Sequence, residues 1–471
     1  MHRHRAALVC LIPTILAALP AAAAESAARP RPTPVTRPAM KRLLEDMKQR
    51  EPRIPLPELT VEERAAAEAD PMTHGYEGRL RSLHLPGTEL RSYIFFGGSA
   101  PRRPGAPPPR VVVEPDPATT LDYGFKTRLF WIASRANNCQ YCLGHQESKL
   151  LAVGMTDDDL AALDSDWSAF PEAEQAAFAF ARGLTTAPWT VDDAMVERLR
   201  PFYTDLQILE MALSVGGNNA INRWKEGIGV PQSGNGGSSG FTQTGADGVH
   251  SYLTPTGERF RTVASVVAAT TAPAISDDLV ATVLDADLPR PDTATLLQLA
   301  ATRRARLPLA DDATVRRVLG ERVPEGSIPG WMRLLAHYPV AGPRAVAALV
   351  AGEDAIGLPP LLRARLRYVV ARQDGAAYAL GEARTDLRDL GQSDAQIAAL
   401  EADVADVPEA DRTLLILARD LASSPVMLTD DTFAAALAAN EPATLTRTIH
   451  YVALRALFDR FTEAAGLPLD R

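Results

Sequence analysis

The sequence has little cysteine, no basic block and no predicted nucleotide-binding loop. Only three of its 471 residues are cysteine, too few for a small domain held together by disulfides. Its 49 Lys and Arg against 58 Asp and Glu give a net charge of −9, and no cationic segment stands out to neutralise nucleic-acid phosphates. No glycine-rich fingerprint of a flavin or nicotinamide site follows a strand. With 471 residues, 46% of them hydrophobic, we expect about two to three globular domains. From the charge pattern and the missing glycine motif we expect no nucleic-acid partner and no bound cofactor.

A single apolar run, residues 6–20, lies near the amino terminus. It follows two Arg and two His in residues 1–5 and precedes small residues at 21–24. A bilayer about 30 Å thick needs roughly 20 residues of helix, so this run is too short to span it. The pattern is typical of a signal peptide. We expect residues 1–24, including Cys10, to be removed, leaving a secreted or periplasmic protein with no membrane span.

Two segments read as linkers, and the rest reads as helix. Residues 25–40 are rich in proline, and residues 232–255 begin with a run rich in glycine and serine. Elsewhere Ala, Leu, Glu and Arg dominate, and helix start signals recur. Alternation typical of strands is weak and confined to 91–96 and 110–114. The sequence therefore predicts an all-α protein.

The chain contains an internal repeat with an offset of 237 residues. Residues 127–166 align with 364–403 without a gap, and glycines and prolines occur at matching positions in the two copies. We interpret this as a tandem duplication, with a first domain at 41–231 and a second at 256–471. Arg128 and Arg135 are matched in the second copy by Arg365 and Arg372, which favours a structural salt-bridge role for them.

The motif Cys139-Gln140-Tyr141-Cys142 occurs only in the first copy. We expect Asn138 to cap a helix whose first turn holds Cys139 and which ends at Gly154. Cysteines at i and i+3 share a helical face and can form a disulfide. The positive end of a helix favours a thiolate, which makes such pairs redox-active. His145, one turn after Cys142, is placed to take a thiol proton.

Two other interpretations of the cysteines remain open. A purely structural disulfide is possible, although it closes a very small loop. Zinc bound by Cys139, Cys142 and His145 is possible only off a regular helix, since positions i and i+6 lie about 9 Å apart along the axis. The second copy has Ala376 and Ala379 in place of the cysteines, so the helix does not need thiols to form. We expect a redox pair and no metal.

Residues 137–160, NNCQYCLGHQESKLLAVGMTDDDL, resemble the signature helix of the alkylhydroperoxidase D and carboxymuconolactone decarboxylase superfamily. The second half, at 328–372, resembles the decarboxylase-type branch. The resemblance implies two tandem alkylhydroperoxidase D-like domains and assembly as a homo-oligomer. It also implies that Cys139, Cys142 and His145 are catalytic, reducing a peroxide or disulfide substrate or relaying electrons to a peroxidase. An external dithiol would supply those electrons.

The sequence departs from the family pattern at two places. The family histidine lies four residues after the second cysteine, where this chain has Gln146. The family acid lies about twelve residues before the first cysteine, near Thr127, so Glu147 and Glu210 are the remaining candidates. Our hypothesis is an exported thiol oxidoreductase. The alternatives are a carboxymuconolactone decarboxylase-like enzyme, or a non-catalytic scaffold or binding protein with a structural disulfide.

Overall fold

The computed structural model describes residues 47, 50–69, 74–91, 115–165, 167–231, 289–402, 404 and 407–470. Over these residues the regular secondary structure is helix throughout, which confirms the all-α prediction. The expected signal peptide, both expected linkers and the weak strand patterns, apart from Arg91, lie outside the described residues. None of the described helices is long and apolar enough to span a membrane.

The described helices fall into two sets along the chain. Those of the first half are α3 (Val61–Ala69), α5 (Tyr76–His84), α6 (Gly87–Arg91), α7 (Tyr123–Ala136), α8 (Gln140–Ala152), α9 (Asp157–Ser165), η2 (Trp167–Ala169), α10 (Glu172–Thr186), η3 (Pro188–Thr190), α11 (Asp193–Glu197) and α12 (Asp205–Ile228). Those of the second half are α15 (Thr293–Thr302), α16 (Asp312–Leu319), η5 (Gly320–Arg322), α17 (Gly330–Leu335), α18 (Ala341–Asp354), α19 (Pro360–Asp374), α20 (Ala377–Asp389), α21 (Asp394–Ala399), α22 (Glu409–Ala422), α23 (Asp430–Ala439) and α24 (Pro442–Ala464).

Six helices of the first half have a counterpart that begins 237 residues later. Helices α7 to α12 begin at residues 123, 140, 157, 172, 193 and 205, and α19 to α24 begin at 360, 377, 394, 409, 430 and 442. Local signals fix several of these starts. Asp122 accepts a hydrogen bond from the Phe125 N–H at 2.9 Å, and Thr204 and Gln207 form a capping box before α12. The offset found in the sequence therefore reappears in the helix starts.

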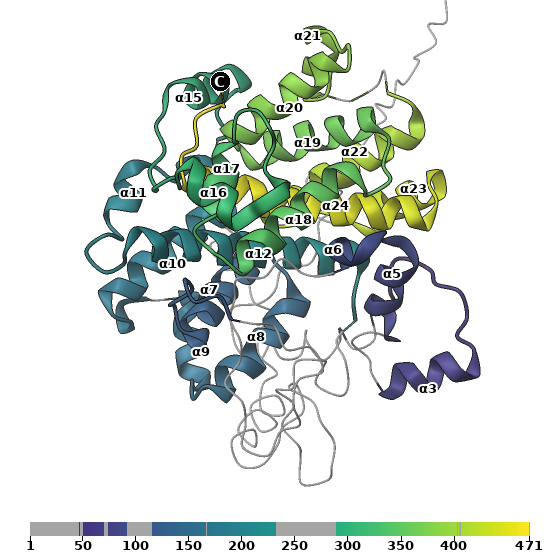
Figure 1. Ribbon diagram of the computed structural model, residues 1–471. Helices are drawn as coiled ribbons and strands as arrows, with labels where there is room; N and C mark the ends of the chain where they lie inside the picture. The colour runs from purple at the N-terminus through teal and green to yellow at the C-terminus, as the bar shows by residue number, and fades with distance from the viewer. Residues whose placement is uncertain are drawn as a thin grey trace, which may run out of the picture.

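The two long helices, α12 and α24, lie at the centre of the molecule, with the first half on one side and the second half on the other (Figure 1). They make the most extensive contact between any two described helices. Gly227 lies where they approach closely, since a Cβ added there would stand 2.5 Å from Ile449. The buried hydrophobic side chains of the two halves form one cluster, so the halves share a core.

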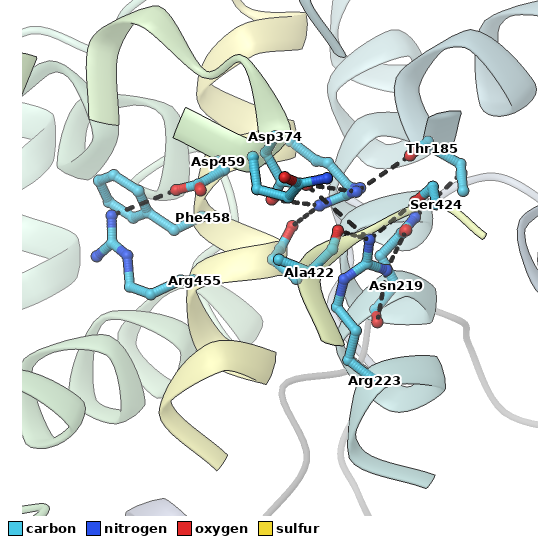
Figure 2. Close-up of polar contacts among 12 residues, drawn as sticks. Thr185, Asn219, Arg223, Asp374, Ala422, Ser424, Arg455, Phe458 and Asp459 are labelled. Carbon is cyan, nitrogen blue, oxygen red and sulfur yellow. Dashed lines mark hydrogen bonds and ion pairs between the residues drawn. The ribbon is translucent and has the colours of Figure 1, made fainter. Parts of the chain in front are cut away.

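Two arginines at equivalent positions cross the contact between the halves. Arg223 on α12 donates through Nη2 to the carbonyl of Ala422 at 2.8 Å, as Figure 2 shows. Arg460 on α24 donates through Nη2 to the carbonyl of Thr185 at 3.0 Å. Residues 223 and 460 differ by the repeat offset, and so do 185 and 422. Each half therefore gives the other the same bond, which is the arrangement of a twofold, isologous interface.

A second reciprocal pair comes from the irregular segments before the repeated helices. Arg53 donates through Nε to Asp430 of the second half at 3.0 Å. Arg306 donates through Nε to Asp193 of the first half at 2.6 Å. The acids are 237 positions apart, but the arginines are 253 apart. The repeat therefore extends beyond the aligned helices, with a change in spacing between the arginines and the first repeated helix.

Two arginines predicted to be structural form ion pairs in this fold. Arg135 pairs with Asp164 at 2.5 Å, and its counterpart Arg372 pairs with Glu401 at 3.0 Å. Arg128 is likewise paired with an acid on α10, at 2.7 Å. Because the bond of Arg135 recurs in the copy without thiols, these arginines hold helices together and do not depend on the cysteines.

Asp459 is a buried carboxylate on α24, close to the contact between the halves (Figure 2). One of its oxygens has no hydrogen-bond partner in the part of the chain that the structure describes, and Nη2 of Arg455 lies 3.4 Å from the other. Burial, opposed by Arg455 and reinforced by the charge of Asp374, raises the pKa of Asp459 to about 8. The first copy has Asn222 at this position.

We expect Asp459→Asn to stabilise the protein, by an amount that grows with pH. The carboxyl of Asp459 has a raised pKa in the folded protein, so it keeps a proton that the unfolded chain loses near pH 4. The unfolding free energy of wild type therefore falls as the pH rises from about 4 toward 8. The asparagine has no proton to lose. The gain in melting temperature over wild type should increase from pH 5 to pH 8. The corresponding gain in unfolding free energy should reach the order of a few kcal/mol. A gain that is independent of pH would contradict this account.

Candidate active site

The two cysteines of the C-x-x-C motif lie where α8 begins, and they form a disulfide with Cα atoms 5.3 Å apart. Cys139 is the N-cap of α8, and Cys142 is its third residue. The prediction that Asn138 caps this helix is wrong. Asn138 has a left-handed φ of 56° because the chain turns there between α7 and α8, so the N–H of Cys139 donates to Ser134 at 2.9 Å. The helix ends at Ala152, two residues before the predicted end, and Gly154 then turns the chain at a φ of 101°.

Both sulfurs are buried, with Cys139 0% and Cys142 2% exposed. The side chain of an N-cap residue normally accepts a hydrogen bond from the first turn of its helix, and Cys139 accepts none while oxidised. Reduction would leave a thiolate at Cys139 facing these amides and the positive end of α8. That position favours the thiolate form.

His145 lies one turn after Cys142, on the same face of α8. Its ring is buried and lies against Tyr141, with the ring centroids 4.5 Å apart. Burial, aided by the charges of Lys149 and Lys225, holds the pKa of His145 well below its ordinary value. The imidazole is therefore neutral at physiological pH, the form that accepts a proton.

Lys225 on α12 brings a cation to the same place. Its ammonium lies 4.6 Å from the centroid of the Tyr141 ring and forms an ion pair with Glu77 of α5. Glu77 also accepts a hydrogen bond from Nε1 of Trp224 at 2.7 Å. Helices α5 and α12 thus fix a paired cation beside the aromatic ring next to the cysteines.

Lys149 is the second lysine of the site. It lies one turn beyond His145 on α8 and is half-buried. Burial, reinforced by the charge of Lys225, lowers the pKa of Lys149 to about 8. Among the described residues no carboxylate pairs with its ammonium. No described carboxylate therefore neutralises its positive charge.

The structure does not bring Glu210 to the disulfide. Glu210 on α12 is fully buried beside the start of α7, where it pairs with Lys126 and accepts the N–H of Thr120 at 2.8 Å. Lys126 lies in the first turn of α7 and Cys139 follows the end of that helix, so about 15 Å of helix separates them. Glu210 is a structural acid that binds the segment entering α7.

The remaining candidates near the cysteines differ in the helical face they occupy. Gln146 is buried at i+4 from Cys142 and shares its face of α8. Glu147 is buried at i+5, which turns it toward another side of the helix. Thr127, where the family has its acid, donates its hydroxyl to the Tyr123 carbonyl at 2.7 Å. Position 127 therefore holds a hydroxyl bonded within its own helix, and no carboxylate.

Lys149 and Lys225 are site residues that the sequence reasoning missed. A signal was available in the internal repeat, since their counterparts in the second copy are Asp386 and Thr462. Lys149 and Lys225 thus differ between the copies in charge, and the cysteines differ in residue type. Nothing in the sequence pointed to Glu77, which comes from a helix outside the aligned repeat.

The arrangement combines a disulfide at a helix start, a neutral histidine and a lysine that no described carboxylate pairs with, which together suit reversible thiol chemistry. The described residues include no group of three or more His, Cys, Asp or Glu that could hold a metal ion. No protein-family model matches the chain, and no curated protein matches it.

Proposed function

We propose that the protein is an exported thiol oxidoreductase that reduces peroxides, with Cys139 and Cys142 as the redox pair and His145 as the base. The observation that carries this proposal is the disulfide at the start of α8, one turn from a neutral histidine. The second copy supports it by contrast, because α20 is as long as α8 and has Ala376 and Ala379 at the two positions. The thiols serve a purpose other than forming the helix.

The reduced pair would act in two steps. His145 takes the proton of the Cys142 thiol, and the thiolate attacks a peroxide oxygen. A sulfur–oxygen bond forms, the oxygen–oxygen bond breaks, and the leaving alkoxide takes the proton to become an alcohol. Cys139 then attacks the sulfur of the sulfenic acid, the disulfide forms and water leaves. The peroxide is reduced by two electrons to alcohol and water, and the two thiols are oxidised.

An external dithiol would close the cycle by thiol–disulfide exchange, leaving as a disulfide itself. Both sulfurs are buried, which favours a small peroxide as the oxidant over a bulky protein disulfide. The common offset of six helix starts supports a duplication of one alkylhydroperoxidase D-like unit, with thiols at 41–231 and none at 256–471.

The proposal can be tested by mass spectrometry of the intact protein. The reduced protein, mixed with one equivalent of peroxide, should lose about 2 Da as two hydrogens leave, and excess dithiothreitol should restore the mass. Alkylation of the thiols before the peroxide is added should prevent the change. The control is the rate at which the same peroxide oxidises free dithiothreitol. If peroxide re-forms the bridge no faster than that, the proposal is rejected.

A further inference from the structure

Lysine is rare in this chain, and its placement is uneven. Only five of the 49 basic residues are lysine, and the rest are arginine. The described residues include Lys126, Lys149 and Lys225, and the charges of the last two act on His145, one turn from Cys142. Lysine therefore gathers at the candidate site of a protein that uses arginine at nearly every other cationic position.

Lys149 is placed to act on whatever reaches the cysteines. It follows Cys142 by seven residues, two helical turns or about 10 Å, on the same face of α8. Side chains on a helix lean toward its amino-terminal end, which for Lys149 is the direction of His145 and the cysteines. The charge of Lys149 acts on His145, one turn nearer the sulfurs, and helps to lower its pKa.

Within the described part of the chain, the charges at the site leave Lys149 without a paired carboxylate. Lys225 is paired with Glu77, while no described carboxylate pairs with Lys149. A half-buried ammonium that has lost part of its water is stabilised by any anion that reaches it. The protein as a whole carries −9, so this local cation attracts anions that the rest of the surface repels.

We propose that Lys149 binds the anionic group of the substrate, so that the disulfide site selects peroxides that carry a carboxylate. The carboxylate would lie on the Lys149 ammonium while the peroxide group reaches the sulfurs two turns away. The identity of the substrate as a peroxide rests on the proposed function, but the presence of an anion site beside the thiols does not.

Two alkylating reagents of similar size test the anion site without any peroxide. The measured quantity is the rate of alkylation by anionic iodoacetate divided by the rate with neutral iodoacetamide. This ratio should be higher for the reduced wild-type protein than for its Lys149→Met variant. We expect the ratio of the two rates to fall at least about fivefold in that variant. Any change in thiol reactivity affects both reagents and cancels in the ratio. Lys149→Arg keeps the charge and should keep the ratio, and Arg388→Met, which removes an exposed charge from α20, serves as the matched control.

Turnover of a carboxylate-bearing peroxide and a neutral one then separates the two proposals. If Lys149→Met loses turnover of the anionic peroxide alone, both proposals are supported. If wild type reduces neither peroxide but shows the iodoacetate preference, the anion site stands and the proposed function fails. An alkylation ratio that is equal in wild type, Lys149→Met and Lys149→Arg would overturn the anion site, whatever the turnover.

Discussion

Replacing Cys139 and Cys142 together with alanine is expected to lower thiol-dependent peroxide turnover by about 10³-fold or more, because the group that attacks the peroxide is lost. The fold should remain. The second copy has Ala376 and Ala379 at these positions, both fully buried at the start of a helix that begins at the equivalent residue. The bridge joins residues only three apart, so its loss should cost about 2 kcal/mol of unfolding free energy in the chain-entropy account.

The measurement is the rate of peroxide loss with a dithiol reductant, with circular dichroism to show that helix content is unchanged. The single variants Cys139→Ser and Cys142→Ser separate the cysteine that attacks the peroxide from the one that closes the disulfide. A variant that keeps the attacking cysteine should still reduce one equivalent of peroxide, and a variant without it should reduce none. Ala379→Ser alters the same position of the second copy and should leave turnover intact. Turnover that survives in the double alanine variant would leave only a structural role for the bridge.

The helices and their repeat could be predicted because their signals are local. Caps such as Asp122 and Thr204 mark helix starts, and the constant offset of 237 keeps the halves in phase without a gap. Asn138 was misplaced because its side chain suits an N-cap and a left-handed turn equally well. Only the turn between α7 and α8 decides between the two.

The contact between the halves could not be predicted in the same way. Arg53 and Arg306 repeat with a different offset, although both begin similar strings, RIPL and RLPL. Their reciprocal bonds join residues more than a hundred positions apart, and such bonds leave no periodic pattern along a sequence. The same holds within the site. Cys139, Cys142 and His145 on α8 were found from their spacing, and Lys149 of the same helix was missed. Lys225 and Glu77 come from distant helices.

The largest expected loss of stability comes from Arg460→Met. Arg460 is fully buried and forms a bidentate ion pair with Asp374, at 2.8 and 3.0 Å. Methionine fills much of the space but leaves the carboxylate of Asp374 in the core, with its nearest remaining cation, Arg223, at 3.9 Å. Breaking a buried pair from one side costs about 3–5 kcal/mol, which urea unfolding would measure.

A second substitution shows whether the buried charge causes that loss. The first copy has Asn137 where the second has Asp374, and Asn137 accepts a hydrogen bond from Arg223 at 3.1 Å. Adding Asp374→Asn to Arg460→Met removes the uncompensated carboxylate, so the double variant should recover about 1–2 kcal/mol. Strictly additive costs would show that the pair is not coupled.

The same variants also test whether the halves unfold together. Arg460 binds the carbonyl of Thr185 as well as Asp374, so its loss weakens the contact between the halves as well as the second half itself. Because α12 and α24 share one core, wild type and variants should unfold in a single transition. The exposed Arg388→Met should change stability by no more than about 0.5 kcal/mol. Two separate transitions in wild type would mean that the halves are independent units, and Arg460→Met would then lower only the second of them.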